Sequence, residues 1–112
     1  MKIFHNPSCS KSRETLDILK NSGKNVEIIE YLKQTPSKEE LFEIVNLLGG
    51  NAELIIRKTE EIYKEKFKGK NLTQEEWIDA MLKYPKLIER PIVIDGKKAI
   101  IGRPPTNVLE LL

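Results

Sequence analysis

The sequence predicts an α/β fold, in which a helical insert separates the βαβ and ββα halves of a four-stranded mixed sheet. Three observations predict it. Positions 2–32 have the pattern strand, helix, strand; positions 35–86 carry amphipathic helices; and positions 91–101 form two apolar strands around Asp95-Gly96. A helical crossover makes the strands that it joins parallel, whereas a two-residue turn makes them antiparallel. We therefore expect a single domain over residues 1–112, with the insert at about 35–86.

The βαβ half begins with a short apolar strand at 2–5, which ends at the turn Asn6-Pro7. A helix follows over 10–21 and ends at Ser22-Gly23, because glycine is the usual residue just after a helix C-terminus. The second strand covers 25–32. The apolar positions expected to face the core are Leu16, Ile18, Leu19, Val26, Ile28 and Ile29.

The helical insert contains two capping boxes, at 37–40 and 73–76, in which Ser or Thr and a Glu three residues later satisfy each other's backbone N–H groups. Each box begins an amphipathic helix, and the second helix ends before Pro85. Short helices are predicted between them, over 51–56 and 60–67. The apolar faces of the two capped helices consist of Leu41, Ile44, Val45, Leu48, Trp77, Ile78, Met81 and Leu82.

The ββα half is a hairpin followed by a short helix. Strands at 91–94 and 97–101 flank Asp95-Gly96, and Asp-Gly is among the strongest hairpin signals because glycine accepts a positive φ without steric cost. The segment Gly102-Arg103-Pro104-Pro105 then leads to a C-terminal helix at 106–112.

The composition is that of an ordinary globular protein, which excludes several classes of function. Hydrophobic residues make up 39% and charged residues 32% of the chain, and a formal net charge of +2 is too small to favour nucleic acid. No apolar run reaches the length of a membrane span, and the N-terminus lacks a signal-peptide core. A single cysteine excludes an intramolecular disulfide. We therefore expect a cytoplasmic protein that binds neither membrane nor nucleic acid.

Cys9, the only cysteine, lies between the first strand and the first helix, in the block His-Asn-Pro-Ser-Cys-Ser-Lys-Ser-Arg at 5–13. Ligands of open α/β sheets lie beyond the carboxyl ends of parallel strands, which is where this block falls. The unsatisfied N–H groups at a helix N-terminus favour an anion, so they lower a thiol pKa and produce the nucleophilic thiolate. A buried thiol that packs as a small hydrophobe is the alternative, but the neighbours of Cys9 do not form an apolar pocket.

Arginine is scarce, with four arginines against 15 lysines. Arg57, Arg90 and Arg103 each fall at the edge of a predicted element. A guanidinium group binds an oxyanion bidentately, which an ammonium group cannot do. This placement favours an anion site, with ordinary surface salt bridges as the alternative for each arginine taken alone.

The presence and absence of other motifs limit the reactions that Cys9 could carry out. Cys9 and Ser12 have the C-x-x-S spacing of a thioredoxin-type motif without its second cysteine, so an adduct on Cys9 requires an external thiol for release. The phosphatase loop Cys-x5-Arg is absent, because Thr15 occupies the arginine position. Nucleotide-binding loops and metal-ligand spacings are absent as well. His5 either supports the Cys9 thiolate or caps the end of the strand.

The block at 5–13 resembles the active-site segment of the glutaredoxin-coupled arsenate reductases, which are ArsC-like enzymes with a thioredoxin-like fold and a helical insert. The resemblance covers nearly the whole chain and extends to Tyr31-Leu32 and to the stretches 55–58, 87–93 and 102–104. It implies a cis peptide bond between residues 90 and 91, which is uncommon even before proline. It also implies these roles: Cys9 as the nucleophile, Arg57, Arg90 and Arg103 as the oxyanion ligands, and His5 and Ser12 as supporting residues.

The activity implied by this resemblance is glutathione- and glutaredoxin-dependent arsenate reduction, a reaction of arsenical resistance, with glutathione as co-substrate and no bound metal, flavin or nicotinamide. Two alternatives remain. One is an Spx-like regulator, which has the same fold and binds RNA polymerase; the other is a monothiol glutathione-dependent thiol transferase without a role in arsenic chemistry. Ser12 in place of a second cysteine and the three retained arginines favour the reductase.

Overall fold

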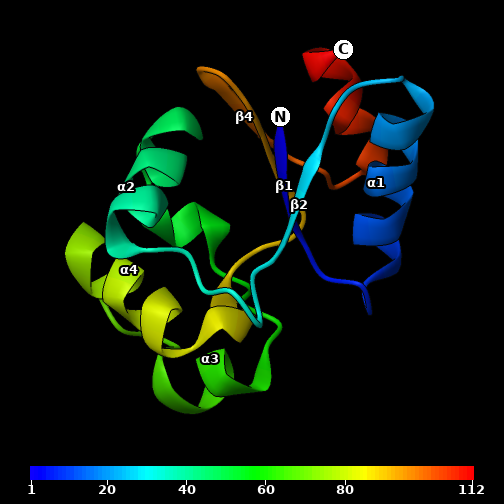
Figure 1. The fold of residues 1–112 in the computed structure, drawn as a ribbon. Helices are drawn as coiled ribbons and strands as arrows, with labels where there is room; N and C mark the ends of the chain where they lie inside the picture. Colours follow the sequence, from blue (N-terminus) through cyan, green and yellow to red (C-terminus); the bar gives the residue numbers. More distant parts are fainter. The chain divides into compact units, whose positions relative to one another are not determined.

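The computed structural model describes all 112 residues, and the chain divides into two compact units. The first unit comprises residues 1–34 and 90–112 and contains the whole sheet, whereas the second, residues 35–89, is helical (Figure 1). With η for a 3₁₀ helix, the elements are β1 (Lys2–His5), α1 (Ser10–Asn21), β2 (Glu27–Glu30), α2 (Lys38–Leu47), η1 (Ala52–Ile55), α3 (Glu61–Lys66), α4 (Gln74–Lys83), η2 (Pro85–Leu87), β3 (Ile92–Asp95), β4 (Lys98–Ile101) and η3 (Pro105–Leu111).

The sheet of the first unit has the strand order β2-β1-β3-β4. β1 and β2 are parallel, with Ile3 opposite Ile28, as the crossover through α1 predicts. β3 runs antiparallel to both β1 and β4. The predicted four-stranded mixed sheet is therefore confirmed, and the loop that carries Cys9 leaves the carboxyl end of the parallel pair.

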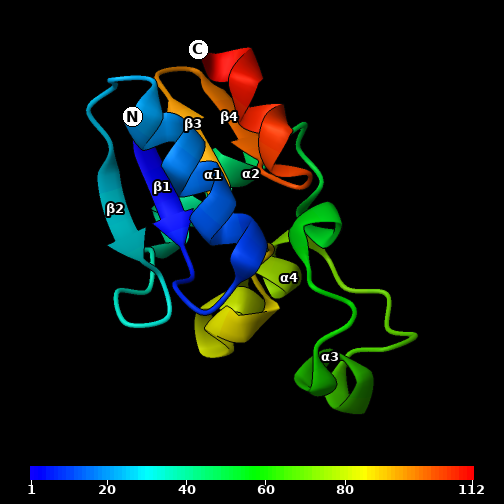
Figure 2. The same ribbon diagram turned by 90° about the vertical axis from the view of Figure 1, so that its right-hand side faces the viewer.

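One face of this sheet is covered by α1 and η3, which lie side by side (Figure 2). Burial of their apolar side chains against the strands fixes the axis of α1, and with it the position of the helix N-terminus at Cys9. The buried side chains of this cluster are Ile3, Leu16, Leu19, Val93, Val108 and Leu111.

The second unit is built around α4, which contacts α2, η1 and η2. Both predicted capping boxes are confirmed, one beginning α2 and the other α4. Lys38 joins these two helices, since its ammonium nitrogen lies 2.8 Å from a carboxylate oxygen of Glu75 and 3.0 Å from one of Asp79. A single antiparallel bridge between Ile56 and Ile88 joins the segments that follow η1 and η2.

Two strand predictions differ from the structure in their limits. β2 covers 27–30 instead of 25–32, because β1 has only four residues and offers no partner to positions 25 and 26. The hairpin turn is Gly96-Lys97 instead of Asp95-Gly96, which leaves Asp95 in the ladder opposite Lys98. Gly96 has a φ of +61° and so takes the turn position that requires glycine, one place earlier in the turn than expected.

Two helical segments also differ from the prediction. The C-terminal helix is a 3₁₀ helix that begins at Pro105, one residue earlier than expected, because proline lacks only an N–H that the first turn of a helix does not use. The second is the short 3₁₀ helix η2, which the sequence did not predict. η2 presents the carbonyl oxygen of Leu87 to the backbone N–H of Arg57, with 2.7 Å between the two atoms.

Candidate active site

Cys9 is the N-cap residue of α1, with an extended backbone (φ −99°, ψ 121°), as the sequence predicted. The loop before it is closed by a hydrogen bond from the Cys9 N–H to the Asn6 carbonyl oxygen, at 3.0 Å. The Cys9 carbonyl then accepts the first helical hydrogen bond, from the Arg13 N–H, also at 3.0 Å. The thiol is half-buried and forms no disulfide. It is therefore held rigidly at the positive end of the helix.

The pKa of the Cys9 thiol lies below its ordinary value, although partial burial alone raises it. The backbone N–H of Ser12 opposes burial most strongly, followed by the positive charge of Arg90, the N–H of Lys11 and a hydrogen bond from Arg90. Helix N–H groups and guanidinium groups both favour the charged form of a thiol. These contacts therefore favour the thiolate form of Cys9 over the thiol.

This lowered pKa predicts the pH dependence of alkylation at Cys9. Because only the thiolate reacts, the rate of iodoacetamide modification should rise with pH and reach half its maximum below the ordinary thiol pKa of about 8.5. Arg90→Gln removes a positive charge and should move that midpoint to higher pH. Lys97→Gln, at the exposed hairpin turn, is the matched control and should leave it unchanged. A wild-type midpoint at or above 8.5 would contradict the assignment.

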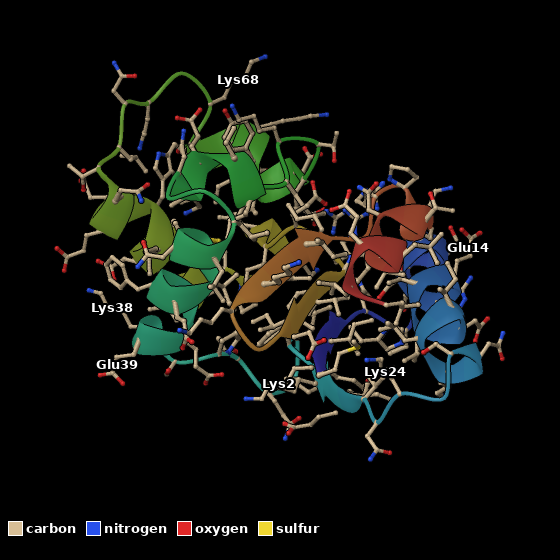
Figure 3. The ribbon with its side chains drawn as sticks, turned by 90° about the horizontal axis from the view of Figure 1, so that it is seen from above. Lys2, Glu14, Lys24, Lys38, Glu39 and Lys68 are labelled. Carbon is tan, nitrogen blue, oxygen red and sulfur yellow. The ribbon has the colours of Figure 1, made fainter.

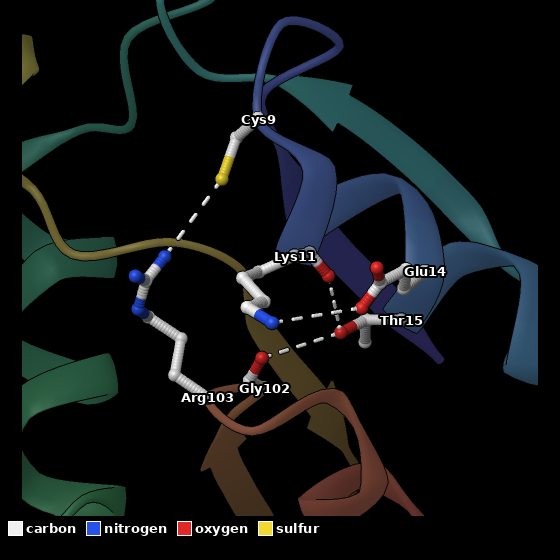
Figure 4. Close-up of polar contacts among 6 residues, drawn as sticks. All are labelled: Cys9, Lys11, Glu14, Thr15, Gly102 and Arg103. Carbon is white, nitrogen blue, oxygen red and sulfur yellow. Dashed lines mark hydrogen bonds and ion pairs between the residues drawn. The ribbon is translucent and has the colours of Figure 1, made fainter.

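Arg103 also contacts the thiol. One of its Nη atoms lies 3.8 Å from Cys9 Sγ, a long hydrogen bond to sulfur that joins residues from the two ends of the chain (Figure 4). Arg103 is exposed, so water and salt screen its charge. Arg90, which is half-buried, is a guanidinium group that lowers the thiol pKa.

Gly102 holds the Arg103 segment against α1. The Thr15 hydroxyl donates to the Lys11 carbonyl oxygen at 2.8 Å and lies 3.4 Å from the Gly102 carbonyl oxygen (Figure 4). A Cβ atom at Gly102 would lie 2.6 Å from Thr15 Oγ1 and 2.8 Å from Pro91 Cγ, so only glycine fits. Gly102 thus allows a close approach of the arginine-bearing segment to the first helix.

Two Arg-Pro dipeptides flank this contact, and both have cis peptide bonds. The bond between Arg90 and Pro91 confirms the prediction, whereas the one between Arg103 and Pro104 was not predicted. The Gly102 N–H donates to the Pro91 carbonyl oxygen at 2.9 Å, which places the two dipeptides next to each other. The structure thus brings Arg90 and Arg103 to Cys9 from the two strands of one hairpin, at its open end.

Arg57 lies in the second unit, and its contacts are described within that unit. Its side chain is only 17% exposed, and a terminal guanidinium nitrogen lies 3.4 Å from a carboxylate oxygen of Glu60. The Nε atom is buried and has no hydrogen-bond partner. Buried donors are almost always paired in folded proteins, so an unpaired one is unusual. The Nε–H group of Arg57 is therefore able to bind an acceptor atom of a ligand.

His5 and Ser12 form a buried pair beneath the Cys9 loop. His5 Nδ1 lies 2.6 Å from Ser12 Oγ, which also accepts a hydrogen bond from the Asn6 N–H at 3.0 Å. Which of the two side chains donates depends on the tautomer of the His5 ring. Burial lowers the pKa of His5, with Lys20 and Arg13 acting in the same direction against Glu30, so the ring is neutral at pH 7. His5 has no hydrogen bond with Cys9; it is linked to the thiol through Ser12.

Two residues of this site have no assigned role in the sequence analysis, Thr15 and Gly102. Thr15 was noted only as the absence of an arginine, and Gly102 as part of a loop. A further contact, from Arg13 Nη1 to the Pro7 carbonyl oxygen at 2.8 Å, ties the Cys9 loop to α1. Only the Gly-Arg-Pro spacing could have drawn attention to Gly102, because glycine beside a functional residue often marks a close backbone approach.

The structure contains no group of three or more His, Cys, Asp or Glu side chains that could hold a metal ion. None of its helices combines the length and the apolar character that crossing a membrane requires.

Comparison with known proteins identifies the family. The model of the ArsC family matches residues 4–111. The chain therefore belongs to the ArsC family, and the resemblance noted in the sequence is confirmed. The thioredoxin-like fold with a helical insert is confirmed too, since solved arsenate reductases share it over the whole chain.

Similar proteins cover the full length of this chain. An arsenate reductase of Haemophilus influenzae is 46% identical over 112 residues, covering 98% of this chain and 97% of the relative. An uncharacterized protein of Escherichia coli K12, YfgD, is 46% identical over 114 residues, covering 100% of this chain and 96% of the relative. The solved structure of an arsenate reductase from Vibrio cholerae matches with a TM-score of 0.93 at 47% identity, covering 100% of this chain and 98% of that one.

Proposed function

We propose that this protein is an arsenate reductase that uses glutathione as co-substrate and glutaredoxin as its protein partner. The observation that carries the proposal is a thiol of lowered pKa next to two guanidinium groups, those of Arg90 and Arg103. A nucleophilic sulfur beside two fixed positive charges suits attack on a small tetrahedral oxyanion. The arsenate reductases that match the whole chain support arsenate as that oxyanion.

Three arginines bind the oxyanion in this proposal. Arg90 and Arg103 lie beside Cys9, and the buried Nε of Arg57 offers a further donor without a partner. Arginine suits the task because its planar fork of N–H groups matches two oxygen atoms of arsenate or of a related oxyanion at once. Arg57 enters this proposal through the family resemblance, which assigns it the same role as the other two arginines.

The first chemical step is attack of the Cys9 thiolate on arsenic(V). The S–As bond forms as an As–O bond breaks, and the departing oxygen takes up protons and leaves as water. The guanidinium groups stabilise the negative charge on the remaining arsenate oxygens. Ser12 and His5 support this step by holding the first turn of α1, whose N–H groups stabilise the thiolate before attack.

Reduction then requires a second thiol, since Cys9 is the only cysteine of the chain. Glutathione adds to the arsenic adduct, and the two sulfur atoms join as a mixed disulfide between Cys9 and glutathione. The two electrons released reduce arsenic(V) to arsenic(III), which leaves as arsenite. A glutaredoxin thiolate attacks the glutathione sulfur of this disulfide and restores the Cys9 thiolate. These steps need no bound metal or cofactor, and reduced glutathione fits a cytoplasmic location.

A coupled assay tests the proposed function. Purified protein is mixed with glutathione, glutaredoxin, glutathione reductase and NADPH, and NADPH oxidation is followed after addition of arsenate. The expected result is a rate that requires arsenate and stops when glutathione or glutaredoxin is omitted. Phosphate, which has the same shape and charge but is not reduced by thiols, should support no turnover.

Each of two results would contradict this proposal and identify a different function. Glutathionylation and deglutathionylation of Cys9 at rates independent of arsenate would identify a thiol transferase. Retention of purified RNA polymerase by the immobilised protein, together with no arsenate-dependent turnover, would identify a regulator.

A further inference from the structure

Asn107, a half-buried residue of η3, holds the chain segment that carries Arg103. Its side-chain nitrogen Nδ2 donates to the carbonyl oxygen of Ile101 at 3.2 Å and to that of Arg103 at 3.1 Å. A side-chain amide nitrogen has two hydrogens, so one asparagine can satisfy both oxygens. Because carbonyl oxygens only accept hydrogen bonds, the nitrogen of the amide must face them and not its oxygen. Asn107 therefore joins the two ends of residues 101–103.

The backbone of Gly102, in the middle of this segment, is bound on both sides as well. Its N–H donates to the Pro91 carbonyl oxygen at 2.9 Å. Its carbonyl oxygen lies 3.4 Å from the Thr15 hydroxyl (Figure 4). Side chains from two helices, Asn107 of η3 and Thr15 of α1, thus hold three successive carbonyl groups, and the asparagine holds two of them.

The packing of η3 gives Asn107 a fixed position. Val108 and Leu111 of this helix are buried in one core cluster with Leu16 and Leu19 of α1. Seen from above, η3 again lies beside α1 (Figure 3). Close packing of apolar side chains allows little movement between two elements. The place of Asn107 relative to the first helix is therefore determined by the core.

The guanidinium group of Arg103 depends on such an anchor because the side chain is exposed. One of its Nη atoms lies 3.8 Å from Cys9 Sγ, which is long for a hydrogen bond. A long exposed side chain has many accessible rotamers, and ordering it costs conformational entropy. A fixed backbone limits where the guanidinium group can reach, so the contacts of Asn107 keep it near the thiol.

We propose that Asn107 is a positioning residue for oxyanion binding, which holds the backbone of Arg103 so that its guanidinium group stays beside Cys9. The inference rests on the proposed function, in which Arg103 binds arsenate. Both hydrogen bonds of the Asn107 side chain end on backbone carbonyl oxygens, so it acts on the oxyanion through Arg103. Its loss should lower the affinity for arsenate without changing the reactivity of the thiol, which depends on Ser12 and Arg90.

Protection of Cys9 against alkylation tests this inference without requiring turnover. Iodoacetamide is uncharged, arsenate at the site blocks its access to the thiol, and no reduction occurs when glutathione is left out. The measured quantity is the arsenate concentration that halves the alkylation rate. Asn107→Leu keeps the size of the side chain but removes both donors, so this concentration should rise about five- to tenfold. The alkylation rate without arsenate should stay within about twofold of wild type.

Further variants separate positioning from a general loosening of the fold. Thr106→Val, at the exposed neighbouring position of η3, is the matched control and should resemble wild type within about twofold. Arg103→Gln removes the guanidinium group, so adding Asn107→Leu to it should not raise the arsenate concentration further. If urea denaturation shows that the leucine variant does not fold, Asn107→Ala makes the same test with a smaller side chain.

Equal protection of wild type and Asn107→Leu by arsenate would overturn the inference and leave the proposed function intact. The inference would also be overturned if the effects of Asn107→Leu and Arg103→Gln added in the double variant, because Asn107 would then act on more than Arg103. A changed alkylation rate without arsenate would have the same meaning. If arsenate does not protect the wild type, the proposed function fails and this inference fails with it, so the two failures have different readouts.

Discussion

Replacing Cys9 with serine is expected to abolish arsenate reduction, with a fall in kcat of at least about a thousandfold. A serine hydroxyl does not ionise near neutral pH, so the variant lacks the anionic nucleophile that the Ser12 N–H and Arg90 stabilise. Serine oxygen also cannot form the mixed disulfide that supplies electrons to arsenic. The loss should appear in arsenate-dependent NADPH oxidation at saturating glutathione and glutaredoxin.

Ser10→Ala is the matched control for this change. Ser10 is exposed in the first turn of the same helix, one residue from the nucleophile. Its variant should keep activity within a few-fold of wild type, as expected for an exposed side chain away from the reacting atoms. A serine variant at position 9 that kept a tenth or more of the wild-type rate would show that the sulfur of Cys9 does not carry the reaction.

Gly102→Ala is expected to give the largest loss of stability, about 1–3 kcal/mol in the free energy of unfolding. The new Cβ would lie 2.6 Å from Thr15 Oγ1 and 2.8 Å from Pro91 Cγ, and neither a buried threonine nor a proline ring can move away easily. Gly102 does not have a positive φ, so alanine fits its backbone and the effect is steric. Urea denaturation measures the loss. Displacement of Arg103 should lower arsenate turnover as well.

The double variant Gly102→Ala, Thr15→Ala distinguishes this collision from a general weakening of the loop. Thr15→Ala removes Oγ1 and Cγ2, two of the three atoms nearest to the added Cβ. The double variant should therefore lose less stability than the sum of the two single losses, which is the sign of coupling between residues in contact. A Gly102→Ala protein as stable as wild type would rule out the close approach.

Local signals predicted much of the fold. The two capping boxes marked the starts of α2 and α4, because the side chains that satisfy the first N–H groups of a helix are adjacent in sequence. The crossover between β1 and β2 established that these strands are parallel. The limits of β2 and of the hairpin turn were predicted less accurately. They depend on the length and register of the partner strand, which a single segment does not contain.

In the candidate site, too, local features could be predicted and long-range contacts could not. Cys9 could be predicted, because its position between a strand and a helix is a local property. Arg90 and Arg103 could be singled out from their scarcity and their position at element edges, but not their approach to the sulfur. The contact between Thr15 and Gly102 joins residues 87 positions apart, and neither has a local signature of it. Such contacts depend on how the hairpin packs on α1, which is decided by the tertiary fold.

The hairpin that carries the two arginines has its tip at the opposite end of the ladder from them. Ile92 pairs with Ile101 at the base, next to Arg90 and Arg103, whereas the exposed Gly96-Lys97 turn closes the other end. Length changes at such a turn leave the register at the base intact. The turn is therefore a suitable position for a fluorophore or an affinity tag. A label there lies at the far end of the hairpin from Arg90 and Arg103, so it should leave the activity unchanged.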